Sequence, residues 1–366
     1  MKDKVLAKDT RIIISIIIIF VAIFCLWQVV RPWMAEYFYR KGFVENTYRR
    51  YEDSIRSLNT ANKFAPWETY YMITQVRNYE EMSRQAEGVA NKVAWLTKSK
   101  DLYELMIKIN PTNPWYYSGL AAIYLSLFNF SPTPEERKKF YDLAGDAYKK
   151  AASIDNLNPL FQMSLAYYYH RSGKVEEAVK LYEKCTILDD LFVEAYYNLG
   201  EIEISKGNYD AAIKRFEQMV SADEQTYDKD TKTYPDWVKG GNFNNYRAKL
   251  GELYLAKRDF KQAIYYFKYA LEKNQEDARV WRGLGVAYHQ SGEIELAIYA
   301  YKQALNIDPE MTDVNKYLGY AYYNAGLLNS SMENLRHYSS GNPGDKKAQE
   351  DMDKIGVIRS RFPGKQ

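Results

Sequence analysis

The chain has 366 residues, of which 46% are hydrophobic, 27% charged and 16% aromatic, and its 50 basic side chains nearly balance 47 acidic ones. This balance excludes a polybasic nucleic-acid-binding protein and an acidic tail protein, and the apolar content excludes a largely disordered chain. Two cysteines and three histidines, far apart in the sequence, are too few for a disulfide framework or a metal site. We therefore expect no enzyme, no cofactor and no metal.

Residues 12–30 form a nearly uninterrupted apolar segment, which predicts a transmembrane helix. Gln28 is its only strongly polar side chain, and its nineteen residues would span roughly 28 Å as a helix, close to the hydrocarbon thickness of a bilayer. Tryptophans and tyrosines cluster at its C-terminal end, where aromatic rings suit the headgroup layer. A cleaved signal peptide would have a shorter apolar region and a small-residue cleavage site. Phe24, directly before Cys25, argues against a lipoprotein.

Residues 1–11 predict a short basic tail before this helix. Positive charges flank the apolar segment on both sides, so the positive-inside rule does not decide its orientation. When a short basic tail precedes a single membrane span, the tail usually remains in the cytoplasm. We therefore expect a single-pass protein of the cytoplasmic membrane whose large domain lies on the extracytoplasmic (periplasmic) side.

Beyond the apolar segment, the sequence repeats with a period of 34 residues. The clearest unit, residues 278–311, has Trp281, Leu284, Gly285, Tyr288, Ala297, Tyr301, Ala304 and Pro309 at fixed offsets. This unit resembles the tetratricopeptide repeat (TPR) family at all eight of its signature positions. The same phase continues over residues 35–345, which eight units tile: 35–68, 69–113, 114–158, 159–192, 193–243, 244–277, 278–311 and 312–345.

The resemblance implies an all-α fold, a right-handed superhelical solenoid of about eight TPR helix pairs. A small residue at the eighth and the twentieth position of a unit lets its two helices approach closely, and a large residue at the twenty-fourth fills the space between them. Asp-Pro and Asn-Pro steps are expected to end the second helices. Residues 346–366 predict a C-terminal capping helix and tail, with Ala348, Met352 and Ile355 on one face.

Three units are longer than 34 residues. Units 69–113 and 114–158 each carry eleven extra residues, about three helical turns, which predicts lengthened helices. Ser131 or Thr133 is expected to cap the second helix of the latter unit. The third insertion, 227–243, predicts a loop that contains Trp237, either packed on a neighbouring helix or used for recognition. Its acidic residues lack the glycine and glutamate of a calcium-binding loop.

The resemblance also implies a concave groove, lined by the second, fifth, ninth, twelfth and thirteenth residues of each first helix. These positions, together with the loop tryptophan, give the candidate partner-binding residues: Tyr167, His170, Arg171, Tyr197, Glu201, Trp237, Arg279, Arg282, His289, Lys316, Tyr320 and Tyr323. Tyrosine and arginine are frequent anchors of protein interfaces. Tyrosines at these positions can instead stack between repeats, and this alternative stays open.

These features predict a non-enzymatic, membrane-anchored scaffold or adaptor that binds extended or helical segments of partner proteins and organises a cell-envelope complex. The alternative is a membrane-tethered chaperone or assembly factor for exported or envelope proteins. At the positions where some TPR proteins bind chaperone tails with lysine and asparagine, this chain has residues such as Met163 and Tyr167. We expect no nucleic-acid partner, and the sequence leaves homo-oligomer formation open.

Overall fold

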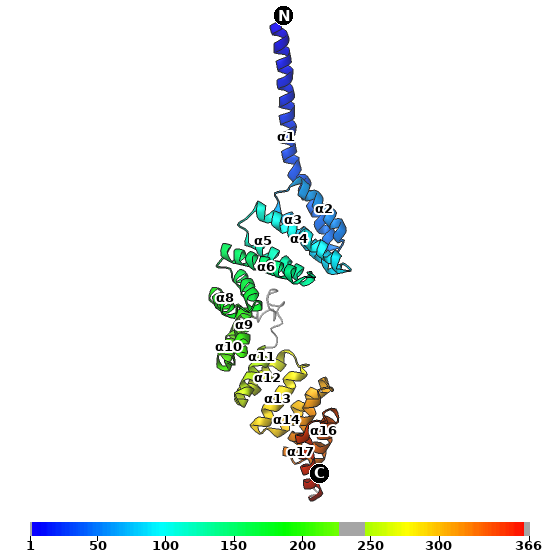
Figure 1. The fold of residues 1–366 in the computed structure, drawn as a ribbon, viewed down its shortest axis with the longest axis vertical. Helices are drawn as coiled ribbons and strands as arrows, with labels where there is room; N and C mark the ends of the chain where they lie inside the picture. Colours follow the sequence, from blue (N-terminus) through cyan, green and yellow to red (C-terminus); the bar gives the residue numbers. More distant parts are fainter. Residues whose placement is uncertain (1, 227–245, 362–366) are drawn as a thin grey trace. The chain divides into compact units, whose positions relative to one another are not determined.

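The structure, a computed structural model, describes residues 2–226 and 246–361, so the predicted loop at 227–243 and its Trp237 lie outside the described residues. Within these ranges the chain forms helices and no strand, which confirms the expected all-α fold (Figure 1). The chain divides into two compact units, one ending at Leu181 and the other beginning at Tyr182.

The first compact unit is built from seven helices and the first half of an eighth. In chain order they are α1 (Lys2–Thr47), α2 (Tyr51–Phe64), α3 (Thr69–Gln85), α4 (Val89–Ile109), α5 (Pro114–Phe130), α6 (Pro134–Ile154), α7 (Pro159–Arg171) and α8 (Val175–Leu188). Helices that follow one another pack together, α1 with α2, α3 with α4 and α5 with α6. This pairing is the one expected for repeated helix pairs.

The second compact unit continues with the end of α8 and the helices after it. They are α9 (Val193–Ser205), α10 (Tyr209–Thr226), α11 (Tyr246–Ala256), α12 (Phe260–Lys273), α13 (Ala278–Ser291), α14 (Ile294–Ile307), α15 (Thr312–Asn324), α16 (Leu328–Gly341) and α17 (Lys346–Arg361). Packing again joins neighbours, α9 with α10, α11 with α12, α13 with α14 and α15 with α16.

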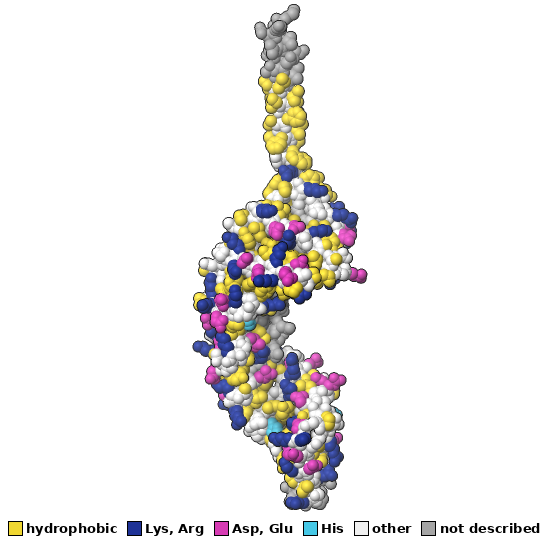
Figure 2. All heavy atoms as spheres, viewed as in Figure 1, with side chains coloured by type: hydrophobic (Ala, Val, Ile, Leu, Met, Phe, Trp, Pro, Cys, Tyr) yellow, Lys and Arg dark blue, Asp and Glu magenta, His cyan; other side chains and the backbone are white. Residues whose placement is uncertain are grey.

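Helix α1 contains the apolar segment and continues without a break into the first repeat. Its most apolar stretch after Ile13 has a mean hydropathy of 2.9 and is not buried, and apolar side chains cover it in Figure 2. Membrane spans and N-terminal signal sequences share this length and composition. The predicted span and the first helix of the repeat at residue 35 form one helix, because only Pro32 lies at the junction and a proline removes a single backbone donor.

The end of α2 holds the junction between the apolar helix and the first repeat. The Arg31 guanidinium donates a hydrogen bond to the carbonyl of Phe64 and lies 4.6 Å from the centre of the Trp67 ring. The rings of Phe38 and Phe64 stack with centroids 5.9 Å apart. Helix α1 is thereby attached to the helix that follows it on both sides of residue 35.

Local sequence signals explain where many helices begin and end. The side chains of Asn113, Thr133 and Asn158 each accept a backbone N–H at the start of α5, α6 and α7, and a proline follows each cap. Of the two residues expected to cap α6, Ser131 and Thr133, the cap is Thr133. The fifteenth residue of six units has a positive φ, at Arg49, Gly173, Gly207, Arg258, Gly292 and Gly326.

The two predicted insertions lengthen helices. Helices α4 and α6 have 21 residues each, whereas α14 and α16 have 14. Helices α3 and α5, with 17 residues each, also exceed the 13 residues of α15. The extra turns therefore extend both helices of each pair.

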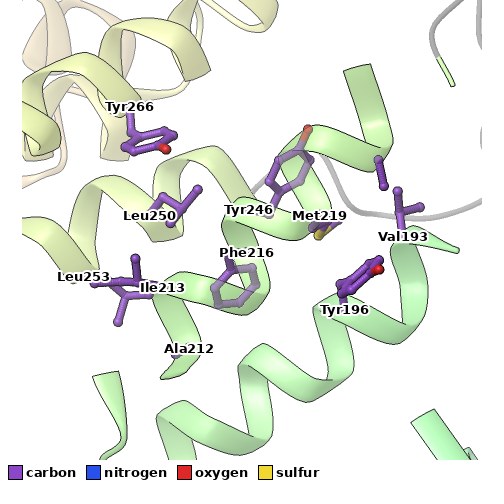
Figure 3. Close-up of a cluster of buried hydrophobic side chains, with 11 residues drawn as sticks. Val193, Tyr196, Ala212, Ile213, Phe216, Met219, Tyr246, Leu250, Leu253 and Tyr266 are labelled. Atoms are coloured by element: carbon purple, nitrogen blue, oxygen red, sulfur yellow. The ribbon is translucent and has the colours of Figure 1, made fainter. Parts of the chain in front are cut away.

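Small residues bring the two helices of a repeat into close contact, as the pattern predicts. A Cβ atom on Gly285 would lie 2.6 Å from the Tyr301 ring, and one on Gly200 would lie 2.7 Å from the Phe216 ring. Both rings are completely buried. Figure 3 shows Phe216 among the apolar side chains of α9, α10, α11 and α12. The core of the second unit is therefore built where a glycine of one helix admits an aromatic ring of the next.

The last helix covers the end of the repeats. Ala348 and Ile355 of α17 are buried, Met352 is partly buried, and this side packs against Leu335 of α16. The predicted apolar face of the capping helix is confirmed.

Candidate functional site

The predicted partner-binding residues fall into both compact units. Tyr167, His170 and Arg171 belong to α7 in the first unit, where Tyr167 is 48% exposed, His170 is partly buried and Arg171 is exposed. Eight others lie on α9, α13 and α15 of the second unit. The last, Trp237, lies outside the described residues. The two sets are therefore treated as separate surfaces.

In the second unit, the predicted positions lie on the sides of α9, α11, α13 and α15 that we call the first-helix face. Charged residues of this face pair from one repeat to the next. The Lys249 ammonium lies 2.6 Å from the Glu201 carboxylate, and the Arg282 guanidinium lies 2.9 Å from the Asp313 carboxylate. Each pair joins first helices of consecutive units, so Glu201 and Arg282 already have partners within the protein.

The same arrangement continues from α15 to the capping helix. The Lys316 ammonium lies 2.6 Å from the carboxylate of Asp345, which also accepts a hydrogen bond from the Tyr338 hydroxyl at 2.9 Å. One turn further along α15, the Tyr320 hydroxyl donates to the carboxylate of Asp351 at 3.0 Å. Two predicted binding residues therefore hold α17 on the last repeat.

These contacts determine the charge states on the last repeat. Hydrogen bonds from the Lys316 side chain, the Ala348 backbone N–H and the Tyr338 hydroxyl lower the pKa of Asp345 to about 2. Burial, with a further contribution from the hydrogen bond to Asp351, raises the pKa of Tyr320 to about 12. At neutral pH this end of the first-helix face presents the ionised carboxylate of Asp345 and the neutral phenol of Tyr320.

His289 and Tyr197 are also engaged with neighbouring side chains. The His289 ring nitrogen Nε2 lies 2.7 Å from the side-chain amide of Asn324 on the next first helix, and burial lowers the pKa of His289. The Tyr197 ring packs edge-on against Phe216 with centroids 6.0 Å apart. Both residues therefore contribute to the packing of repeats as well as to the surface.

Two predicted residues of this face extend into solvent. Tyr323 is 39% exposed at the end of α15. Arg279 is exposed near the start of α13, and the one acidic partner of its guanidinium among the described residues is the capping Asp277 of its own helix, at 3.7 Å. They are the side chains of the first-helix face that a partner could contact without first breaking a link between repeats.

Three cavities were not predicted from the groove positions of the first helices. One of about 390 Å³ includes Glu80, Lys92 and Phe130, and one of about 430 Å³ includes Trp281 and Tyr299. A third, of about 440 Å³, includes Arg171, which the sequence did single out. All three use residues of second helices, which the groove positions of the repeat pattern leave out.

Comparison with known proteins agrees with this architecture. A tetratricopeptide repeat family model matches residues 164–225 and 248–312. The solved C-terminal part of a TPR repeat-containing protein from Cytophaga hutchinsonii superimposes with a TM-score of 0.53 and 16% identity, covering 77% of this chain and 98% of that one. At that identity the likeness concerns the fold.

Curated relatives match over parts of the chain. A TPR repeat-containing protein of Methanocaldococcus jannaschii is 25% identical over 229 residues, which cover 60% of this chain and 39% of the relative. The heat-shock protein cognate co-chaperone sgt12 of Aspergillus fumigatus is 30% identical over 104 residues, 25% of this chain and 30% of the relative. The chain thus spans less than two fifths of either relative. We conclude that the described chain has an all-α fold of paired helices and that residues 164–225 and 248–312 match tetratricopeptide repeats.

Proposed function

We propose that this protein is a non-enzymatic, membrane-tethered adaptor that binds other proteins through the first-helix face of its repeats. The observation that carries the proposal is the composition of that face, where the exposed Arg279 and Tyr323 stand beside the paired Arg282 and Lys316. Tyrosine and arginine combine a large contact area with directed hydrogen bonds. Because pairing between repeats restrains the surrounding side chains, less conformational freedom is lost when a partner binds.

The partner we propose is an extended or helical protein segment. Helices α13 and α15 are the first helices of consecutive repeats, and equivalent positions on them carry the predicted binding residues. Successive residues of a bound segment would therefore contact successive repeats. Pairs such as Arg282 with Asp313 are partly exposed, with 37% and 45% of their side-chain surfaces accessible. Exposed ion pairs contribute only about 0–1 kcal/mol to stability. Either side chain can therefore leave its internal partner and pair with a charged group of the bound segment at little cost in free energy.

The tether we propose is the apolar part of α1, as a retained single span of the cytoplasmic membrane. Its length, composition and lack of burial support a span, and Arg31 follows it at the first repeat. We further propose that the repeats lie on the extracytoplasmic side of this membrane. In that position the adaptor would organise a complex of the cell envelope.

A tethered chaperone or assembly factor is the second candidate. The specific observation in its favour is the match to a protein whose name describes a co-chaperone, over a quarter of the chain. Such a protein would contact many clients briefly, whereas an adaptor would hold one or two partners in fixed proportion. The two functions therefore differ in the stoichiometry of what is bound.

The test is an affinity isolation of the full chain from detergent-solubilised membranes, with bound proteins quantified. The groove variant combines Arg279→Ala with Tyr323→Ala, which leaves the links between repeats intact. The matched control combines Lys261→Ala with Tyr265→Ala on the second helix α12, where both side chains are exposed. An adaptor should retain one or two near-equimolar partners that are lost in the groove variant and kept in the control.

Other outcomes decide between the candidates. A broad set of exported proteins, each far below equimolar amounts, would favour the chaperone. Equal recovery of the same partners by the groove variant and the control would contradict binding through the first-helix face.

A further inference from the structure

The cavity of about 440 Å³ in the first compact unit has an unusual lining. Its walls are Phe128 of α5, Pro134, Arg137, Lys138 and Tyr141 of α6, and Arg171 at the end of α7. Three of these side chains are cationic and none is acidic, so the lining carries a formal charge of +3. The volume lies within the range of about 300–1,000 Å³ that ligand pockets occupy. Arg137, Lys138 and Arg171 are exposed, so the cavity is a depression that is open to solvent.

The insertion in residues 114–158 builds this cavity. Helix α6 has 21 residues where α14 has 14, and its added first turns carry Arg137 and Lys138. The shorter second helix of a regular repeat, such as α14, lacks these turns. The one lining residue that belongs to a regular groove position is Arg171, so the cavity adjoins the surface on which the repeat pattern predicted a partner.

The aromatic walls are fixed by contacts within the unit. The Phe128 and Tyr141 rings lie 5.6 Å apart between centroids, and Tyr141 stacks on Tyr168 at 4.8 Å. The Tyr141 hydroxyl donates to the Tyr168 carbonyl at 3.2 Å. These contacts give the cavity a rigid apolar wall beside its charges.

The cations are oriented but not neutralised. Arg137 uses its Nε–H on the carbonyl of Ser131 at 2.8 Å, which directs its guanidinium while leaving the terminal nitrogens for another acceptor. Within the described residues, Lys138 and Arg171 have no ion pair or hydrogen bond to an acidic side chain. Glu135 and Glu136 occupy the same turn of α6 but do not line the cavity.

We propose that this cavity binds an acidic segment of a partner protein, taking a carboxylate side chain between Lys138 and Arg171 and an adjacent apolar side chain against Phe128 and Tyr141. Guanidinium groups bind carboxylates through paired, charge-assisted hydrogen bonds, and aromatic walls favour an apolar neighbour over an isolated ion. The site lies outside the regular repeat positions. It rests on the proposed protein-binding function and supplies the chemical class of the segment.

The test uses two fluorescein-labelled nonapeptides with the full chain in uncharged detergent at low salt. One has two glutamates beside a phenylalanine, and the other has glutamines in their place. We expect the glutamate peptide to bind at least tenfold more tightly by fluorescence anisotropy. The double variant Lys138→Gln with Arg171→Gln should bring this ratio close to one, whereas Lys139→Gln, an exposed neighbour outside the lining, should leave it unchanged.

Three results would overturn the proposal. They are no binding of the glutamate peptide at millimolar concentration, an unchanged ratio in the double variant, and binding of phosphatidylglycerol micelles in place of the peptide through the same two residues. The last result would assign the cavity to a lipid surface. If affinity isolation finds no partner that depends on the first-helix face while the peptide ratio behaves as expected, the adaptor proposal fails and the cavity proposal stands. If such a partner is found but the peptide ratio does not change as expected, only the cavity proposal fails.

Discussion

At the scale of single residues, the twentieth position of a repeat shows how the family pattern and local chemistry combine. Ala297 at this position is completely buried, and so are Ser54 in the first repeat and Ser331 in the last. The Ser54 hydroxyl donates to the Gly42 carbonyl at 2.6 Å and accepts from Asn78 at 2.7 Å. The Ser331 hydroxyl has no hydrogen-bond partner in the described part of the chain. Of these two serines at equivalent positions, the Ser54 hydroxyl therefore stabilises the fold and the Ser331 hydroxyl destabilises it.

We expect Ser331→Ala to raise the free energy of unfolding by about 1 kcal/mol, because it removes a buried hydroxyl without a partner. Ser54→Ala should lower it by about 1–3 kcal/mol, because it also leaves Asn78 without an acceptor. Urea unfolding followed by far-ultraviolet circular dichroism measures both. A loss of stability in Ser331→Ala would mean that this hydroxyl is bonded in solution.

Asp345 makes the attachment of the capping helix dependent on pH. Its pKa in the folded protein is about 2, and an unfolded aspartate titrates near 3.9. Because the folded value is lower, the stabilisation is complete above about pH 4 and is lost as the pH falls towards 2. We therefore expect Asp345→Asn to have a lower melting temperature than the natural protein at pH 6, and this gap to close by pH 2.

The matched control for this prediction is Asp353→Asn, which removes an exposed carboxylate of the same helix that lies outside the contacts around Lys316. Its melting temperature should follow that of the natural protein at each pH. A gap for Asp345→Asn that stays constant from pH 6 to pH 2 would show that the carboxylate does not titrate as this geometry requires.

At the scale of helices, α1 belongs to the apolar segment and to the first repeat at once. Ala35 and Tyr39 of α1 are buried against Leu58 of α2, whereas the apolar stretch after Ile13 has no contact that buries it. The repeat part of α1 is therefore held by its own packing, which does not require the residues before it.

Deleting residues 2–30 should leave a strongly helical protein whose melting temperature is within a few degrees of the full chain, and should move it from the membrane fraction to the supernatant. Circular dichroism and fractionation measure these effects, and the intact mass of the full chain reports whether the apolar segment is retained. A mass that lacks the segment would identify a cleaved signal sequence. Membrane retention of the deleted form would mean that other residues bind the membrane.

Much of the helical order could be predicted from the sequence because its causes are local. Thr133 as a cap and the lengthening of α6 follow from residues close together in the chain. The links of Arg282 with Asp313 and Lys316 with Asp345 join residues 31 and 29 positions apart. A pattern of groove positions marks such side chains as exposed but does not state which of them pair. The cavity at Arg171 was unforeseen because its walls come from three helices.

At the scale of the molecule, the chain is a series of neighbour contacts within two compact units. Among the described helices, substantial packing joins helices that are adjacent or next but one in the chain, such as α12 with α13 and α13 with α15. Stability in such an array is close to a sum of repeat and interface contributions. A substitution at an exposed position such as Tyr323 should therefore affect binding without unfolding distant repeats.

The most direct measurement is site-specific photocrosslinking in intact cells. A photoreactive amino acid replaces Tyr323 on the first-helix face or, as control, Tyr265 on the second helix α12, which is 56% exposed. The adaptor proposal predicts one or two discrete crosslinked partners from position 323 and none of them from position 265. The same products from both positions, or none from position 323, would contradict binding through the first-helix face.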